Sequence, residues 1–336
     1  MKKKIKNDGA YMKIWKFYLL ILSVGFLQAQ EYNRPVHTYS IVAYDSASGQ
    51  MGVAVQSHWF QVGTVVTWAE AGVGVVATQS FVDVDYGKLG LDLMRGGKTA
   101  PQALQALLTT DPHADVRQVA MIDVHGNVAS HTGEHCIAEA GHFKGDHFST
   151  QANIMEKKSV WPAMAEAYQK SGGELVDRLM AALKAAQAEG GDIRGKQSAA
   201  ILIVPVKSNG QPWKEKIVDL RVDDNPEPLR EMERLIMIHR AYEHMNKGDE
   251  YLAHDNVEAA LKEYSIAHEI YPEQVEILFW TAATMADIGK IDESLPLFKE
   301  VFEKEPSWRE VLKRLPRAGL LPNDASLIKR ILQVSN

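Results

Sequence analysis

The stretch TYSIVAYD at residues 38–45, followed by QMGVAVQS at residues 50–57, decides how the first part of this chain folds. β-branched and aromatic residues favour strands, and SASG at residues 46–49 has the small, polar composition of a tight turn. We therefore predict an antiparallel hairpin. A second pair of strands, at residues 64–69 and 73–79, is predicted around Ala71 and Gly72. Because the first strand begins on Thr38, a hydroxyl stands at the head of a core strand.

The first 29 residues have the pattern of a secretory signal peptide. Lys13 and Lys16 precede an apolar run at residues 17–27, and Ala29 supplies a small residue at the expected cleavage site. The run is shorter than the roughly 20 residues that a membrane-spanning helix needs. We therefore expect an exported protein, periplasmic or secreted, with no membrane span once residues 1–29 have been removed.

Charge and cysteine content restrict the partners and the chemistry. The chain has a net charge of −6, and residues 1–29 contain six lysines and one aspartate, which leaves −11 on the remainder. Such a surface repels nucleic acids and anionic membranes, so we expect no nucleic-acid partner. Cys136 is the single cysteine and can form no internal disulfide. We interpret it as a small buried residue rather than as a nucleophile.

After residue 80, helices and strands come in blocks. The predicted order is helices at 89–94 and 99–108, a hairpin at 117–122 and 128–131, a polar loop to about residue 153, helices at 159–170 and 174–186, and strands at 198–204 and 217–222. Grouped strands favour antiparallel sheets, and paired helices favour outer layers. We predict an α+β domain at residues 30–226 with a four-layer αββα sandwich. A simpler α+β fold fits the pattern too.

Residues 229–336 have the pattern of a separate helical domain. Small and apolar positions recur at a spacing of 34 residues, with a proline closing each unit: Ala260, Tyr264, Ala267 and Pro272 are followed by Ser294, Phe298, Val301 and Pro306. This is the period of tetratricopeptide (TPR) repeats. The alternative is a generic pair of helical hairpins. A TPR module would bind a protein or peptide partner in its groove.

Thr38 is the first candidate for catalysis. A threonine hydroxyl becomes a nucleophile when a base removes its proton, and an α-amine on the same residue is a suitable base. The hydroxyl would then attack an amide or ester carbonyl, and polar groups must hold the oxyanion. We assign that role to Gln79, at the end of the fourth strand, and to Asn153, after the polar loop. The alternative is that Thr38 is an ordinary β-branched strand residue.

Several motifs resemble an uncharacterised bacterial family, domain of unknown function 1028, which is grouped with the N-terminal-nucleophile (Ntn) hydrolases. The matching stretches are TYSIVA from Thr38, GVAV from Gly52, GVVATQ from Gly74, Arg117-Gln118, TG at 132–133 with Cys136, GGD at 190–192 continuing to Ser198, and DLRVDD from Asp219. The resemblance covers roughly residues 37–226. It implies the αββα fold and a nucleophile at Thr38, and it implies no particular substrate.

Two features depart from the family pattern. Many relatives begin with a methionine followed by threonine, so that removal of the methionine exposes the threonine amine. Here a signal cleavage after Ala29 would leave residues 30–37 in front of Thr38. Either a second cleavage, between His37 and Thr38, exposes the amine, or the amine stays blocked and the mechanism differs; we predict the second cleavage. The family has a Gly-Asn pair where this chain has Ala152 followed by Asn153. We expect the change from glycine to alanine to tighten a turn near the site.

Other polar clusters are weaker candidates for substrate binding. They are Ser57 and His58 at the end of the second strand, Arg117 in a family motif, and Asp192, Arg194 and Gln197 between a helix end and a strand. For Asp192 and its neighbours, structural ion pairs or caps are the favoured alternative. Four histidines, His131, His135, His142 and His147, invite a zinc interpretation. Because they lie on a strand and a loop without paired cysteines, we expect no metal and no cofactor.

The leading hypothesis is an exported Ntn-type hydrolase that cleaves an amide bond in a small or peptide-like substrate, with Thr38 as nucleophile. The rival hypothesis is a non-catalytic envelope scaffold, in which the TPR groove recruits a protein or peptide. Fold alone does not decide between them.

Overall fold

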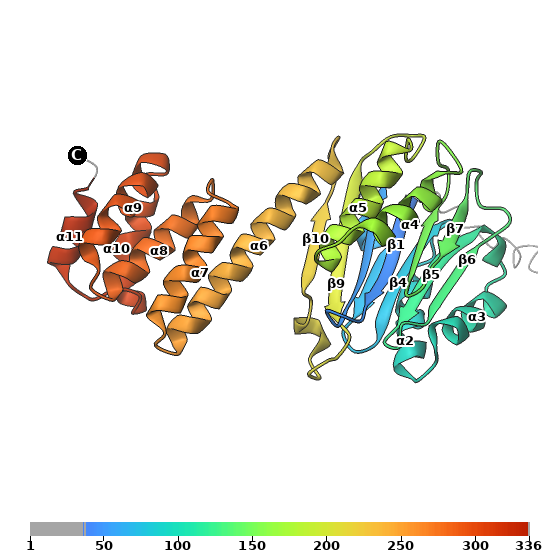
Figure 1. Ribbon diagram of the computed structural model, residues 1–336, viewed down its shortest axis with the longest axis horizontal. Coiled ribbons are helices and arrows are strands. Elements are labelled where there is room, and N and C mark those ends of the chain that lie inside the picture. The colour runs from blue at the N-terminus through green and yellow to red at the C-terminus, as the bar shows by residue number, and fades with distance from the viewer. Residues whose placement is uncertain (1–35, 37, 335–336) are drawn as a thin grey trace, which may run out of the picture. The chain divides into compact units, whose positions relative to one another are not determined.

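The computed structural model describes Val36 and residues 38–334. This part of the chain has two antiparallel sheets in its N-terminal part, followed by a helical C-terminal region (Figure 1). The fold is therefore of the mixed α+β class. The predicted signal peptide at residues 1–29 lies outside the described residues. Among the helices of the described residues, none is both long and apolar enough to cross a membrane.

The larger sheet has six strands in the order β10-β9-β2-β1-β8-β7. Its strands are β1 (Thr38–Asp45), β2 (Gln50–Ser57), β7 (Gly141–Lys144), β8 (Phe148–Ala152), β9 (Ser198–Pro205) and β10 (Val218–Val222). The predicted first hairpin is its centre, because β1 pairs with β2 from Thr38 opposite Ser57 to Asp45 opposite Gln50. Thr38 therefore begins an internal strand of this sheet.

The smaller sheet has four strands in the order β3-β4-β5-β6. Its strands are β3 (Thr67–Glu70), β4 (Gly74–Ser80), β5 (Arg117–Asp123) and β6 (Val128–Thr132). The predicted strand at residues 64–69 is partly wrong. The structure has a 3-10 helix at Val62–Thr64 and begins β3 only at Thr67. Gly63 allows this turn to lie against β9, since a Cβ there would come 2.7 Å from the Cβ of Ala200.

A pair of helices packs on the outer face of each sheet. Helices α4 (Val160–Lys170) and α5 (Leu175–Ala188) share a core with Tyr39 and Ile41 of β1. Helices α2 (Asp85–Arg95) and α3 (Ala100–Thr110) share another core with Val76 of β4 and Met121 of β5. Gly52 lets α5 approach the larger sheet, because a Cβ there would lie 2.8 Å from Leu179 Cδ1.

The inner faces of the two sheets form a third core. Alternate residues of each strand point to it, as the pleat requires. Val42, Val53 and Val55 of the larger sheet pack there with Val75 and Ala77 of the smaller one. Towards the start of β1 the inner-face residues change from valine and alanine to threonine, serine and glutamine. This polar end of the interface contains the site described below.

The expectation of a polar loop between residues 132 and 153 is wrong. The structure places strands β7 and β8 there, and β8 pairs with β1 from Tyr39 opposite Ala152 to Ala43 opposite Phe148. The sequence FSTQA of β8 is polar enough to suggest a loop, yet every residue of it is buried. It forms a strand because its serine and glutamine side chains find hydrogen-bond partners between the sheets.

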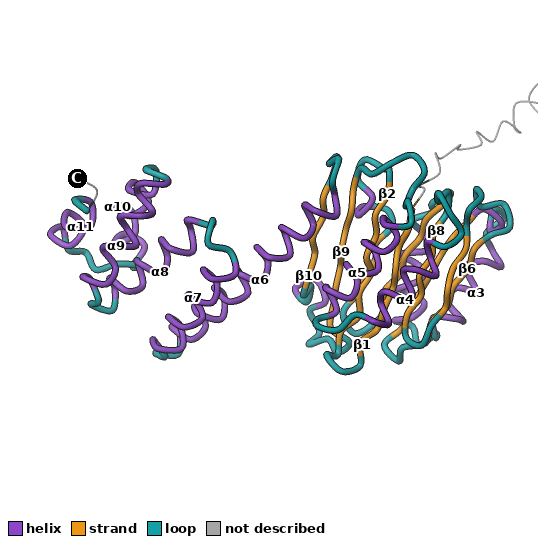
Figure 2. Tube along the Cα trace, turned by 45° about the horizontal axis from the view of Figure 1, so that its top comes forward, coloured by secondary structure: helices purple, strands orange, loops and turns teal. Residues whose placement is uncertain are grey.

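The C-terminal region is helical throughout its described length (Figure 2). Its helices are α6 (Pro228–Ala253), α7 (Val257–Ile270), α8 (Val275–Asp287), α9 (Ile291–Lys304), α10 (Trp308–Ala318) and α11 (Ala325–Leu332). Helix α6 contributes to two cores. Its residues Leu229, Met232 and Ile236 belong to the core of the larger sheet, and Ala241 and Met245 belong to a core with α7. The expected boundary at residues 226–228 therefore precedes residues that complete the sheet core.

This sharing predicts that one position of α6 is decisive for the stability of the sheet part. Met232 is fully buried, whereas Met237, further along the same helix and on another face, is 38% exposed. We expect Met232→Asp to lower the free energy of unfolding by about 3–5 kcal/mol, because it buries an unpaired carboxylate. The matched substitution Met237→Asp should change it by no more than about 0.5 kcal/mol. Denaturant unfolding of the two proteins measures both values, and equal effects would contradict the shared core.

Candidate functional site

The polar end of the sheet interface is built from alternate residues of the central strands. Thr38 and Ser40 lie on the inner face of β1, whereas Tyr39 between them packs against α5 on the outer face. Both hydroxyl-bearing residues are fully buried, as are Gln79 at the end of β4 and Gln118 at the start of β5. Burial of so many polar groups is costly unless each finds hydrogen-bond partners.

The Thr38 side chain is held between two neighbours. Its Oγ1 lies 3.0 Å from the carbonyl oxygen of Val36 and 3.1 Å from Ser57 Oγ. Ser57 faces Thr38 directly across the β1–β2 pair and also faces Ser198 of β9. Ser57, predicted from the sequence only as a weak candidate for substrate binding, is thus placed beside Thr38 by the register of the hairpin.

Gln79 and Asn153 both contact Thr38, and both do so at its carbonyl oxygen. Gln79 Nε2 donates to that oxygen at 3.2 Å and to Gln118 Oε1 at 2.7 Å. The backbone N–H of Asn153 donates to the same carbonyl at 3.1 Å, and Asn153 Nδ2 donates to Gln118 Oε1 at 2.9 Å. The structure thus brings together the three residues that we predicted to be catalytic.

Gln118 links these residues, and sequence reasoning did not assign it a role in the site. Its Oε1 accepts the bonds from Gln79 and Asn153, and its Nε2 lies 2.9 Å from Thr132 Oγ1 and 2.9 Å from the Ala152 carbonyl oxygen. It therefore connects β4, β5, β6 and β8 in one network. The available signal was a glutamine at the start of an otherwise apolar strand.

A second chain of hydrogen bonds, also unforeseen, runs through Ser40. Its hydroxyl donates to Gln79 Oε1 at 2.5 Å and accepts from Gln151 Nε2 at 2.6 Å. Gln151 lies directly opposite Ser40 in the β1–β8 pair, and its Oε1 accepts from Ser149 Oγ at 3.1 Å. Neither Gln151 nor Ser40 stands out in the sequence, because polar residues in a strand usually face solvent.

Two residues beside the cluster have strained backbones. Ser80, which follows Gln79, has φ 70°, and Ile154, which follows Asn153, has φ 54°. Positive φ is uncommon for serine and exceptional for a β-branched residue. Such conformations cost about 1–3 kcal/mol each and concentrate at functional sites. Their position directly after Gln79 and Asn153 marks this end of the interface as the candidate site.

His58, Asp192 and Arg194 form a neighbouring group. The side chain of Asp192 is fully buried and accepts from the His58 backbone N–H at 3.1 Å. Arg194 Nη2 lies 2.7 Å from the same carboxylate. The His58 ring nitrogen Nδ1 is buried and has no hydrogen-bond partner among the described residues. These contacts orient the loop after β2 and hold the segment before β9 against it.

Gln197 and Arg117 are held by structural partners. Gln197 Nε2 donates to Asp224 Oδ1 at 3.0 Å, and its backbone N–H donates to the Ser57 carbonyl. Arg117 donates to Asp111 Oδ2 at 2.8 Å and to the Phe81 carbonyl at 2.6 Å. Burial favours the neutral form of Asp111, but the hydrogen bonds from Arg117, the His113 N–H and Tyr86, together with the Arg117 charge, outweigh burial and lower the pKa of Asp111. The structure shows no contact of either side chain with Thr38.

The four histidines of the zinc interpretation have separate partners. His131 Nε2 contacts the Ala114 carbonyl, His135 pairs with Asp115, His142 contacts Thr132, and His147 contacts the Gly126 carbonyl. Burial lowers the pKa of His142, with smaller contributions from His131 and Lys144. Within Val36 and residues 38–334, no three His, Cys, Asp or Glu side chains are grouped so that they could hold a metal ion.

Cys136 is buried, and its Sγ lies 3.4 Å from the Arg117 carbonyl oxygen. Burial raises the pKa of its thiol, so the thiolate fraction at pH 8 is below that of a free cysteine. We predict that the rate at which dithionitrobenzoate modifies Cys136 is at least about tenfold lower in the native protein than in protein unfolded in guanidinium chloride. Equal rates would show that the thiol is accessible and reactive.

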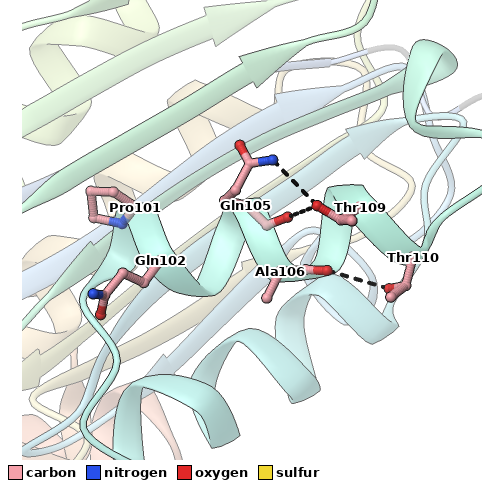
Figure 3. Close-up of a pocket in the computed structure, with 6 residues that line it drawn as sticks. All are labelled: Pro101, Gln102, Gln105, Ala106, Thr109 and Thr110. Atoms are coloured by element: carbon pink, nitrogen blue, oxygen red, sulfur yellow. Dashed lines mark hydrogen bonds between the residues drawn. The ribbon is translucent and has the colours of Figure 1, made fainter.

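A surface hollow lies apart from the polar cluster. It follows one face of α3 and is lined by Pro101, Gln102, Gln105, Ala106, Thr109 and Thr110 (Figure 3). The hydroxyls of Thr109 and Thr110 are bonded to carbonyls of their own helix. Because the hollow has no titratable side chain, it offers no catalytic group.

Comparison with known proteins identifies relatives of this chain. No curated protein matches it. Among solved structures, the crystal structure of protein SPO2555 from Silicibacter pomeroyi, described with the family DUF1028, matches with a TM-score of 0.53 and 29% sequence identity; the match covers 60% of this chain and 88% of that one. The model of the family of unknown function DUF1028 matches residues 38–232, which is more than half of the 336 residues. The chain therefore belongs to the DUF1028 family.

Proposed function

We propose that this protein is an Ntn-type hydrolase that cleaves an amide bond, with Thr38 as its nucleophile. The observation that supports this best is the position of Thr38. Thr38 is fully buried at the start of a central strand. Its carbonyl oxygen accepts hydrogen bonds from Gln79 Nε2 and from the Asn153 N–H within a network of buried amides. A structural β-branched residue would not need such a setting.

The proposed reaction has two steps. Thr38 Oγ1 attacks the substrate carbonyl carbon while the Thr38 α-amine takes the hydroxyl proton. The C–N bond then breaks, the proton passes to the leaving nitrogen, and an ester to Thr38 remains. Water cleaves this ester and restores the hydroxyl. The amine is available only if the bond between His37 and Thr38 has been cut, so the proposal includes that cleavage.

The contacts divide the roles of the two amide side chains. Both hydrogens of Gln79 Nε2 are donated, one to Gln118 and one to the Thr38 carbonyl. We therefore assign Gln79 to the positioning of Thr38. Asn153, which is next to the strained Ile154, remains our candidate for the oxyanion donor. His58, Asp192 and Arg194 are proposed to shape the mouth of the site.

We also propose that the sheet part of the chain is a four-layer αββα sandwich of the Ntn type. Paired helices outside two packed sheets are what a four-layer αββα sandwich of the Ntn type requires, and the three cores described above support it. Export through a signal peptide at residues 1–29 rests on the sequence pattern alone.

We also propose that the helical region is a TPR module. The small and apolar residues that recur at a spacing of 34 residues are buried in both units. They are Ala260, Tyr264 and Ala267 in α7, and Ser294, Phe298 and Val301 in α9. Gly248 packs against the Tyr264 ring, since a Cβ there would come within 2.3 Å of it. Such packing of a small residue against an aromatic one is expected for stacked helical repeats.

This helical region supports the rival function, a non-catalytic scaffold that recruits a protein or peptide. An experiment that needs no substrate separates the two functions. A peptide epoxyketone, which reacts with the hydroxyl and the α-amine of an N-terminal threonine, should label the native protein at Thr38. Absence of labelling on a protein whose terminus is Thr38 would favour the scaffold.

A further inference from the structure

Val36, two residues before Thr38, is bound to the smaller sheet in the way that a peptide ligand would be. Its N–H donates to the Ser80 carbonyl oxygen at 2.5 Å, and its carbonyl accepts from the Ser80 N–H at 3.0 Å. This exchange of both bonds is the hydrogen-bonded pair of an antiparallel ladder. Ser80 is the last residue of β4, and β3 pairs with β4 only as far as Ala77. On that side of β4, the N–H and the carbonyl oxygen of Ser80 therefore pair with Val36 instead.

The same Val36 carbonyl accepts from the hydroxyl of Thr38, at 3.0 Å between the two oxygens. It therefore lies beside the proposed nucleophile while a backbone N–H polarises it. A substrate carbonyl about to be attacked needs both neighbours. The Val36 side chain is fully buried among the valines and alanines between the sheets, so the space around it is apolar and closed to charged groups.

The backbone of Ser80 is strained at the point where it pairs with Val36. With φ 70°, Ser80 leaves the regular strand conformation at the residue where it binds Val36. Strain of this kind persists where the surrounding structure holds it and is a reason to look for function. Gln79, which positions Thr38, directly precedes this residue, so the nucleophile and the Ser80 backbone are fixed by one segment.

We propose that Ser80 and the apolar space around Val36 form the acyl subsite of the enzyme, and that Val36 is a built-in occupant of it. The ligand that replaces Val36 is a peptide whose bound residue has a free amide N–H and a small branched aliphatic side chain. While Val36 is paired with Ser80, it excludes such ligands. The proposal rests on the proposed function for its catalytic meaning, but binding of the peptide does not depend on catalysis.

The test measures peptide binding to full-length protein in which Thr38→Ala prevents turnover. The probe is the synthetic peptide acetyl-Ala-Val-His-amide, and its control is acetyl-Ala-Asp-His-amide. Val36→Asp should expel the occupant because it would bury a charge, and Val36→Gly removes only its side chain. Calorimetric titration should show that both variants bind the valine peptide at least about tenfold more tightly than protein with Val36 intact. The aspartate peptide should not bind.

A matched control is Val84→Asp, since Val84 is 42% exposed and does not belong to the core between the sheets. It should bind the valine peptide no better than protein with Val36 intact. The proposal is overturned if folded Val36→Gly and Val36→Asp proteins do not bind the valine peptide, or if protein with Val36 intact binds it equally well. Should Val36→Asp fail to fold, the Val36→Gly protein decides. Tight binding without cleavage by protein whose N-terminal residue is Thr38 would contradict the proposed hydrolase and leave the subsite standing.

Discussion

Replacing Thr38 with alanine is expected to abolish epoxyketone labelling and to lower amide hydrolysis by about 10³-fold or more, because the nucleophile itself is removed. Thr38→Ser keeps a hydroxyl and should retain labelling. A matched control is Thr78→Ala. Thr78 is equally buried, but its hydroxyl donates to the Asp83 carbonyl on the outer side of β4, away from the polar cluster. That variant should be labelled like the native protein.

The native terminus must be determined on the same samples. N-terminal sequencing of protein recovered from the cell envelope should give Thr-Tyr-Ser, the residues that begin at Thr38. If the terminus remains at Gln30 while Thr38→Ala hydrolyses as fast as the native protein, Thr38 is not the nucleophile. A terminus at Met1 would contradict export as well as maturation.

Replacing Gln118 with methionine is expected to cost about 3–5 kcal/mol of unfolding free energy, although the two side chains are similar in size. Gln79 and Asn153 would each lose the acceptor Gln118 Oε1, and the Ala152 carbonyl would lose its donor. Each buried group left without a partner costs about 1–3 kcal/mol. Denaturant unfolding measures the loss.

The matched control for this prediction is Gln105→Met on the exposed face of α3. Its stability should stay within about 0.5 kcal/mol of the native value. If Gln118→Met is equally neutral, the hydrogen bonds of the cluster are replaceable by water, and the cluster does not rigidify the site. Lower hydrolysis with unchanged stability would instead indicate that Gln118 acts only through the orientation of Thr38.

The central hairpin could be predicted because its information is local. Alternating apolar residues and a polar turn determine that β1 pairs with β2, and this register alone places Ser57 opposite Thr38. Gln79 and Asn153 were predicted as catalytic partners, and the structure shows both at the Thr38 carbonyl. Whether they act in catalysis remains a prediction.

Gln118 and Gln151 could not be predicted because their roles depend on contacts between strands that are far apart in the sequence. A glutamine in a strand ordinarily points to solvent, and only the packing of two sheets turns it inward. The same reason explains why β8 resembled a loop: its polar residues are buried against Ser40 and Ser130. The strain at Ser80 also has no local sequence signal, and the residue with which Ser80 pairs, Val36, is distant in the sequence.

Helix α6 has a thermodynamic consequence for the stability of the two regions that it joins. Its first half completes the core of the larger sheet and its second half completes a core with α7, within one continuous run of 26 residues. Unfolding of either half of α6 removes the helical turns that continue the other half. The free energies of unfolding of the sheet part and of the helical region are therefore linked. A ligand that binds only the helical region therefore raises the melting temperature of the sheet core by mass action. A partner bound to the C-terminal helices would in this way stabilise the sheet core that contains Tyr39, the neighbour of Thr38.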